Sequence, residues 1–356
     1  IVPVSIEAAR ANGRTGSDLV GAVIAGYEIA GRLPKAIGTR NLYLAGLANH
    51  GIAPTFGAAS AAASLMALSP EQVDHMLAYC SQQASGSWQW LLDVGHIEKA
   101  FVFGGMGARN GLQAAYMAQL GFTGVPESFD NENAWFRWRA FQGEGKDHAS
   151  LVDGLHERYE LSLAAMKRYP VGGPTQPAVR ALLDLRETIV PDQVEKIVVA
   201  MPGEAATFER ANMPALNIPY LAAIIMLDGR LDFVDAQSLS RQETDEQARA
   251  FARKVTVVRD EAQEMGEGED RTESARVTVT LKDGRTEERY VAYVPGFPTH
   301  PLGKAEVEEK AIELIEPVLG RSKADRLVAL CDGLDDAPSI EPIIDLMRFD
   351  GDAARS

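Results

Sequence analysis

The sequence predicts a mainly α-helical protein in which both ends of the chain build one large helical domain and a smaller α+β domain is inserted between them. Three observations support this prediction. Apolar residues recur at helical spacing through the first part of the chain and again over 304–347. Runs of β-branched residues and a hairpin turn are confined to the stretch between. We therefore expect the helical domain to comprise 1–166 and 298–356, and the inserted domain to comprise 167–297.

The first expected helices follow from apolar spacing and small residues. Residues 18–32 place apolar side chains at helical spacing, and Ser17 precedes them as an N-cap. The stretch 57–68 consists almost wholly of small residues. Other helices can approach such a helix closely, so we expect it at the centre of the bundle.

Two more helices flank an expected loop. Ser69, followed by Pro70 and by Gln72 three residues after the cap, predicts the start of a helix that ends near Gln83. A loop with two tryptophans follows over 86–95, and 106–120 form a further helix.

The inserted part opens with a turn-rich crossing at 168–174, after which the β signals begin. Four strands are expected, the last two joined by a hairpin turn at 282–285: 194–201, 254–258, 276–281 and 287–294. Three helical segments fall before and between them: 177–186, 219–228 and 241–253.

Composition limits the class of protein. The chain has 356 residues, 46% of them hydrophobic, and a net charge of −15, which argues against nucleic acid as a partner. Its cysteines, Cys80 and Cys331, form no disulfide framework or zinc motif, and no apolar run is long enough to cross a membrane. We therefore expect a cytoplasmic protein. Because the sequence starts at Ile1 without an initiator methionine, we expect a piece of a longer protein.

A cationic, glycine-rich stretch stands out in this acidic chain. His96 and Lys99 are three residues apart, so on a helix they share one face, and Arg109 follows after several glycines. A local cluster of positive charge is needed to attract an anion to a protein of net negative charge. The pattern therefore indicates a small anionic ligand.

Several segments, in this order, resemble the MmgE/PrpD family. They cover the chain from its start to about residue 310 and are Gly26-Tyr-Glu-Ile-Ala-Gly-Arg32, Pro54-Thr-Phe-Gly-Ala-Ala59, Gln83-Ala-Ser-Gly86, Glu98-Lys99, Ala108-Arg-Asn-Gly111, Gly121-Phe-Thr-Gly124, Lys167-Arg-Tyr-Pro170, Pro219-Tyr220 and Leu227-Asp-Gly229.

The resemblance implies a fold and a class of reaction. The family includes 2-methylcitrate dehydratases, cis-aconitate decarboxylases and iminodisuccinate epimerases. It implies a helical domain with an α+β lid domain, a homodimer without a cofactor or metal, and a small carboxylate as substrate. We therefore expect a lyase or isomerase that removes a proton beside a carboxylate of a small di- or tricarboxylate. Dehydration, decarboxylation and epimerisation stay open.

Two departures favour an alternative. Related dehydratases and decarboxylases tend to have histidines where this chain has Val102 and Gln176. They also have a helical stretch before the equivalent of Ile1, with an acidic residue and a histidine of the active site, which this sequence does not contain. The alternative is an inactive homologue that binds a carboxylate or serves as a scaffold.

The resemblance also points to cationic site residues. Lys99 and Lys167 would bind a substrate carboxylate or stabilise developing enolate charge, although a solvated surface lysine is the alternative for each. Arg109 would clamp a carboxylate through paired hydrogen bonds, or else form a structural ion pair. Arg168 and Gln176 are expected to bind substrate.

The proton transfers would fall to histidine and tyrosine. His96 or His50 is the expected general base, because the unperturbed pKa of histidine lies near neutrality. A histidine hydrogen-bonded at a helix start is the alternative for His96. Tyr220 would act as the acid, or else be a buried, hydrogen-bonded core residue.

Overall fold

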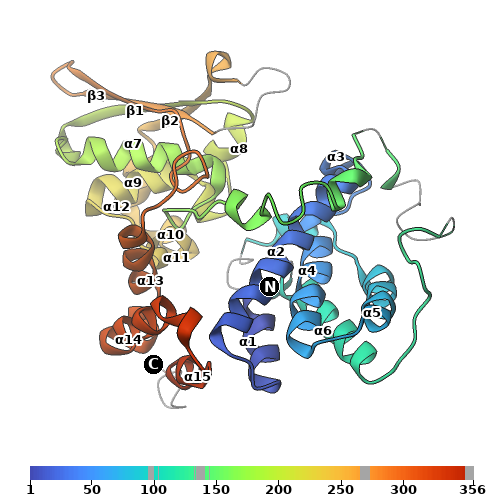
Figure 1. Ribbon diagram of the computed structural model, residues 1–356. Coiled ribbons are helices and arrows are strands. Elements are labelled where there is room, and N and C mark those ends of the chain that lie inside the picture. Colours follow the sequence, from blue (N-terminus) through green and yellow to red (C-terminus); the bar gives the residue numbers. More distant parts are fainter. Residues whose placement is uncertain are drawn as a thin grey trace. The chain divides into compact units, whose positions relative to one another are not determined.

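The computed structural model (Figure 1) describes residues 1–94, 100–102, 104–131, 133, 141–143, 145–264 and 273–348. The chain divides into two compact units, which we consider separately. Unit 1 comprises Ile1–Leu163 with Ile315–Ser356, and unit 2 comprises Ala164–Leu314. The expected mainly helical fold with a small group of strands is confirmed. The domain limits expected at 166/167 and 297/298 stay a prediction.

Unit 1 is helical in its described part. Its α-helices are α1 (Val2–Ala11), α2 (Gly16–Ile37), α3 (Thr39–Leu44), α4 (Asn49–Met66), α5 (Pro70–Gln83), α6 (Gly105–Gln119), α14 (Arg321–Asp332) and α15 (Glu341–Met347). The helix α13 (Lys304–Leu319) runs from unit 2 into unit 1.

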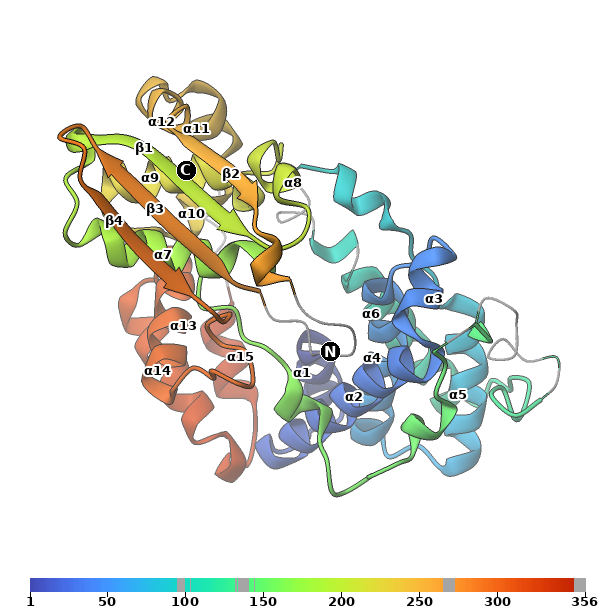
Figure 2. The same cartoon turned by 90° about the horizontal axis from the view of Figure 1, so that it is seen from above.

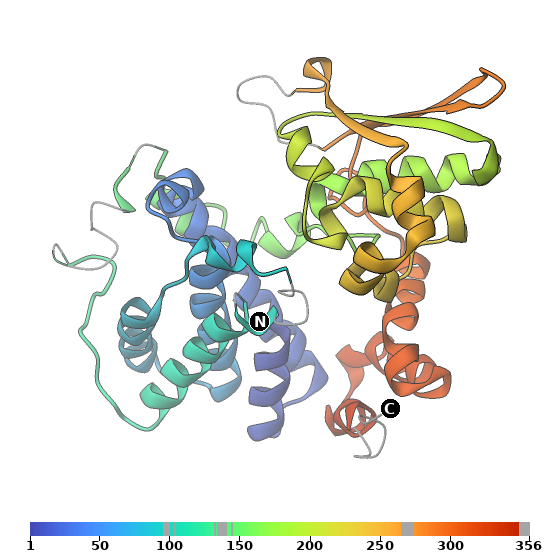
Figure 3. The same ribbon diagram turned by 180° about the vertical axis from the view of Figure 1, so that it is seen from behind.

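Small residues place α4 at the centre of unit 1, as the sequence predicts. The helix packs against α1, α2, α5 and α6, and the same group is seen from behind in Figure 3. A Cβ atom on Gly111 of α6 would lie 2.1 Å from the carbonyl oxygen of Thr55, and one on Gly57 would lie 2.6 Å from the carbonyl oxygen of Gly26. These backbones approach so closely because no side chain separates them.

Two helix starts test the capping predictions. Ser69 caps α5 as expected, and its hydroxyl accepts a hydrogen bond from the Gln72 amide. The prediction of Ser17 for α2 was wrong, because Thr15 is the cap and forms a reciprocal pair with Asp18. Thr15 and Asp18 have the spacing of a capping box, which starts the helix at Gly16.

Unit 2 contains a four-stranded mixed sheet, shown from above in Figure 2. Its strands are β1 (Val194–Met201), β2 (Val255–Arg259), β3 (Ala275–Leu281) and β4 (Thr286–Val291), in the order β2-β1-β3-β4. β1 and β2 are parallel, whereas the other pairs are antiparallel. The expected hairpin joins β3 to β4, and Gly284 adopts the positive φ of +88° in its turn.

Helices cover one face of this sheet (Figure 1). The two longest within unit 2 are α7 (Gln176–Arg186) and α9 (Ile218–Asp228). The shorter ones are α8 (Ala205–Glu209), α10 (Phe233–Gln237), α11 (Leu239–Thr244) and α12 (Glu246–Ala252). The single helix expected over 241–253 is two helices, because the Asp245 carboxylate interrupts the pattern by capping α12.

Candidate functional site

Unit 1 contains a cavity of about 600 Å³ beside the first turns of α4 and α6. This volume is in the range of small-molecule pockets, roughly 300–1,000 Å³. Glycines bring its walls together, since a Cβ atom on Gly51 would lie 2.4 Å from the Ser85 carbonyl oxygen. The lining residues are Ala48, Gly51, Ser85, Gly86, Ser87, Gln89, Trp90, Asp93, Val102, Met106, Gly107 and Asn110.

The residues that line this cavity include one that precedes and one that follows the His96–Lys99 segment in the sequence. Asp93 and Val102 line it, and in the sequence they flank 95–99, the segment that holds His96 and Lys99. Both of these lie outside the described residues, so their roles stay predictions. Asp93 is the one charged residue among the described lining residues. A positively charged group that binds an anionic ligand in this cavity would therefore have to come from a residue outside this lining set.

His50 lies beside this cavity, next to two tryptophans. Its ring meets Trp88 edge to face with 5.5 Å between ring centroids, and Trp90 with 5.3 Å. Trp90 lines the cavity and belongs to a short 3-10 helix, Trp88–Leu92, within the stretch expected to be a loop. His50 itself is in the first turn of α4, which begins at Asn49 rather than near residue 57.

Arg109 and Asn110 extend the polar side of α6. Arg109 is exposed, and its Nη2 donates to Oδ1 of Asn110 at 3.1 Å. Asn110 lines the cavity and donates through Nδ2 to the Gln83 carbonyl at 3.4 Å. Asn110 was not among the predicted site residues, although it lies in the Ala108–Gly111 segment of the family resemblance.

A cluster of cationic residues lies in unit 2 and joins the start of that unit to α13. It consists of Lys167, Arg168 and Lys310. Arg168 pairs with Glu309 at 3.1 Å and with Glu313 at 3.9 Å, and Lys310 Nζ donates to the Lys167 carbonyl oxygen. Desolvation lowers the pKa of the Lys167 ammonium group. Desolvation also lowers the pKa of the Lys310 ammonium group, and the nearby charges of Arg168 and Lys167 lower it further. Burial raises the pKa of the Glu313 carboxyl.

Gln176 fixes the backbone that follows Lys167. The residue is fully buried, and its Oε1 accepts the Tyr169 amide hydrogen at 3.1 Å. Its Nε2 donates to the carbonyls of Tyr169 at 2.7 Å and Val171 at 3.2 Å. Both amide hydrogens of Gln176 are thus committed to backbone. Its expected contact with substrate stays a prediction.

Tyr220 is placed by the start of α9. The Asn217 side chain caps this helix, and the Tyr220 ring is buried. Its hydroxyl donates to the Asp235 carbonyl oxygen at 2.6 Å, and burial raises the pKa of the phenol above its ordinary value. This is the arrangement that the core alternative describes, and the role as an acid stays a prediction.

The described residues bear on two other kinds of site, a metal centre and a membrane-spanning helix. Among these residues, no group of three or more His, Cys, Asp or Glu side chains is placed to hold a metal ion. No described helix has both the length and the apolar character needed to cross a membrane.

Comparisons with known proteins agree with the resemblance across most of the chain. The MmgE/PrpD N-terminal domain matches residues 1–147, and the MmgE/PrpD C-terminal domain matches residues 169–336. The Cis-aconitate decarboxylase-like protein oryM of Aspergillus oryzae is 25% identical over 343 residues, covering 88% of this chain and 67% of that protein.

Proposed function

Because the chain belongs to the MmgE/PrpD family, we propose that it is a cofactor-free lyase or isomerase that acts on a small di- or tricarboxylate. The reaction would begin with removal of a proton from the carbon beside a carboxylate. The observation that carries this proposal is the cavity of unit 1, whose walls include residues on both sides of the segment with His96 and Lys99. The name of the Aspergillus oryzae relative supports the same class of chemistry.

We assign the proton removal to His96 or His50. A neutral imidazole is available near pH 7, since the unperturbed pKa of histidine is about 6.5. The exposed His50 also meets Trp88 and Trp90 edge to face, and Trp90 lines the cavity. Removal of the proton leaves negative charge on the carbon and on the adjoining carboxylate.

We assign to Lys99 and Arg109 the stabilisation of the negative charge that proton removal leaves on the substrate. A cation near the developing enolate stabilises the transition state more than the ground state, which is the requirement for a faster reaction. By the family resemblance, Lys167 and Arg168 bind carboxylates and Tyr220 donates a proton. The assembly into a homodimer is part of the same proposal.

Dehydration and epimerisation pass through this carbanion, whereas decarboxylation generates a carbanion by losing carbon dioxide. Dehydration breaks a carbon–oxygen bond and releases the protonated hydroxyl as water. Epimerisation returns a proton to the opposite face of the carbon. Decarboxylation instead breaks the carbon–carbon bond to carbon dioxide, and the electron pair left on carbon takes a proton.

Proton NMR in D2O tests the proposal. The chain is incubated with 2-methylcitrate, cis-aconitate and single enantiomers of substituted succinates. Deuterium beside a carboxylate, a new alkene, inversion of configuration or loss of carbon dioxide would support it and identify the reaction. Binding of these compounds, seen as a rise in melting temperature without exchange or product, would overturn it in favour of a carboxylate-binding protein.

A lysine variant tests the assigned position. We expect Lys99→Ala to abolish turnover while leaving the melting temperature close to that of the unaltered chain. Lys282→Ala is the matched control, because Lys282 is an exposed lysine in the turn between β3 and β4. Full activity of Lys99→Ala would show that the assigned site is wrong.

A further inference from the structure

A second cavity, of about 580 Å³, lies within unit 2. It is formed by the end of α8, the start of α9, α11, α12 and the start of β2. Its lining residues are Glu209, Arg210, Asn217, Pro219, Tyr220, Gln242, Ala248, Arg249, Ala252, Arg253 and Val255.

Three arginines in this wall are unusual for unit 2. Arg210, Arg249 and Arg253 form no ion pair within 4.0 Å with a carboxylate of the described residues. The other described arginines of unit 2 are all engaged. They pair with carboxylates, as Arg168, Arg180, Arg230, Arg241, Arg259, Arg276, Arg285 and Arg289 do, or donate to backbone carbonyls, as Arg186 does. Arg210, Arg249 and Arg253 are thus exposed residues without a carboxylate partner among the described residues, and all three line one cavity.

The chain brings these arginines together from two elements. Arg249 and Arg253 are four residues apart at the end of α12, so they share one side of that helix, and Arg210 ends α8. An arginine near a helix C-terminus is favoured by the helix dipole even without a ligand. That preference accounts for each position by itself, but it does not account for their convergence on one cavity.

The charge balance of the wall favours an anion. Glu209 is its one acidic residue, and Oε1 of that carboxylate accepts the Val257 amide hydrogen at 3.1 Å. The wall therefore contains three arginines and one carboxylate, and that carboxylate already has a backbone partner. In a chain of net charge −15, such a surplus of positive charge is local to this cavity.

A buried hydrogen-bond acceptor, the Gln242 side-chain oxygen, belongs to a residue of the same wall and favours a ligand that carries a hydrogen-bond donor. Gln242 Nε2 donates to the Ala211 carbonyl at 3.3 Å, whereas its buried Oε1 has no hydrogen-bond donor among the described residues. Buried polar atoms are rarely left without a partner. A hydroxyl group carried by the ligand would satisfy this oxygen.

We propose that this cavity binds a small multivalent oxyanion that also carries a hydroxyl group. Guanidinium groups bind carboxylate and phosphate oxygens through paired hydrogen bonds, so hydroxylated polycarboxylates and hydrogen phosphates share the required chemistry. The inference does not rest on the proposed reaction. The Tyr220 hydroxyl is bonded to the Asp235 carbonyl, so the arginines and Gln242 define the binding groups.

Isothermal titration calorimetry with two probes tests the site. Citrate supplies carboxylates with a hydroxyl, and inorganic pyrophosphate supplies phosphate oxygens. We expect at least one of them to bind, and the tighter one identifies the source of the oxyanion. Arg249→Gln and Arg253→Gln should each weaken this binding about tenfold or more, because each removes a charge-assisted contact. Arg285→Gln, the same change in the exposed hairpin turn, should leave affinity within about twofold.

Several outcomes would overturn the proposal. If neither citrate nor pyrophosphate binds the unaltered chain at millimolar concentration, the proposed site is excluded. Equal losses in Arg253→Gln and Arg285→Gln would mean that only overall charge matters. If the α12 variants fail to fold, Arg210→Gln on α8 takes their place. If the arginine variants lose turnover in parallel with binding, the cavity belongs to the reaction site and the proposal of a separate site is overturned. Unchanged turnover in the same variants supports a separate site.

Discussion

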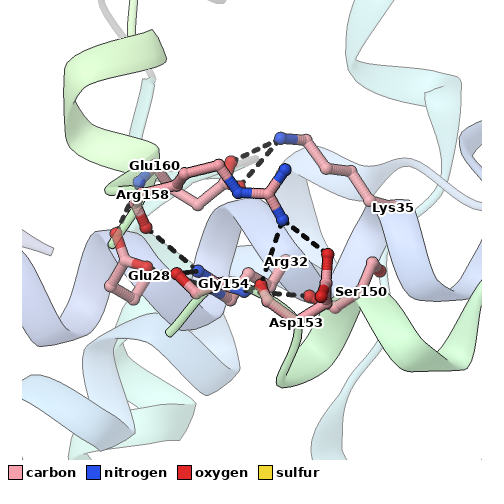
Figure 4. Close-up of polar contacts among 8 residues, drawn as sticks. All are labelled: Glu28, Arg32, Lys35, Ser150, Asp153, Gly154, Arg158 and Glu160. Carbon is pink, nitrogen blue, oxygen red and sulfur yellow. Dashed lines mark hydrogen bonds and ion pairs between the residues drawn. The ribbon is translucent and has the colours of Figure 1, made fainter. Parts of the chain in front are cut away.

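Arg32 and Glu28 form an ion pair inside unit 1, one helical turn apart on α2. Arg32 Nε donates to Glu28 Oε2 at 2.9 Å, and the arginine side chain is only 3% exposed. Figure 4 shows that the other groups of Arg32 reach the backbone of 150–158: Nη1 donates to the carbonyls of Ser150 and Asp153, and Nη2 to that of Arg158. The second Glu28 oxygen accepts the Glu160 amide hydrogen. One buried pair thus anchors 150–160 against α2.

Removal of the arginine should be strongly destabilising. Arg32→Met leaves the Glu28 carboxylate buried without its cation, which costs roughly 3–5 kcal/mol of unfolding free energy in comparable cases. Urea denaturation followed by circular dichroism measures the change. Arg321→Met is the control, since Arg321 forms an exposed pair with Asp325 and should lose less than about 1 kcal/mol. Similar losses in both variants would contradict the role given to burial.

The close contact between α4 and α6 gives a second prediction. Gly111→Ala places a methyl group 2.1 Å from the Thr55 carbonyl oxygen, so the helices must separate. We expect a loss of roughly 1–3 kcal/mol or more in unfolding free energy. Gly21→Ala is the matched change in α2, where nothing lies within 4 Å, and helix propensity should make it neutral or stabilising by up to about 1 kcal/mol. A neutral Gly111→Ala would show that the contact relaxes easily.

Gln176 supports a third prediction, on the backbone after Lys167. Gln176→Leu removes its hydrogen bonds to Tyr169 and Val171, so the Tyr169 amide hydrogen should exchange with solvent at least about tenfold faster. Hydrogen exchange measured by NMR or mass spectrometry gives this rate. Gln193→Leu, at an exposed position before β1, should leave it unchanged. An unchanged rate in Gln176→Leu would mean that other contacts hold this segment.

Local patterns allowed much of the fold to be predicted from the sequence. The cap at Ser69 and the hairpin at 282–285 depend on residues close together in the chain, and both are confirmed. The start of α4 was missed because Gly51 and Pro54 are typical of loops, although here they lie in the first turns of a helix. Tertiary packing outweighed local preference at that point.

The candidate site was harder to predict, because its contacts join distant segments. The hydrogen bonds of Gln176 and the pairing of Arg168 with Glu309 have no local signature in the sequence. Arg210 is also distant in the chain from Arg249 and Arg253, and only the fold places all three around one cavity. His96 and Lys99 lie outside the described residues, so their assignment rests on the resemblance, and Lys99→Ala tests the lysine.

The two cysteines should differ in reactivity and pH dependence. Cys80 is fully buried, which raises the pKa of its thiol from 9.0 to about 12, whereas Cys331 is exposed. A thiol reagent should therefore label Cys331 in the native chain and reach Cys80 only after unfolding.

The raised pKa of Cys80 also makes stability fall with pH. The unfolded chain releases the Cys80 proton above about pH 9, while the folded chain holds it to about pH 12. Its contribution is therefore complete below pH 9 and is lost as the pH rises between these values. In a Cys331→Ser background, unfolding free energy should fall by about 1 kcal/mol more between about pH 8 and 10 than in the same chain with Cys80→Ala. Parallel pH profiles for the two chains, or labelling of Cys80 in the native state, would show that the thiol is reached by solvent.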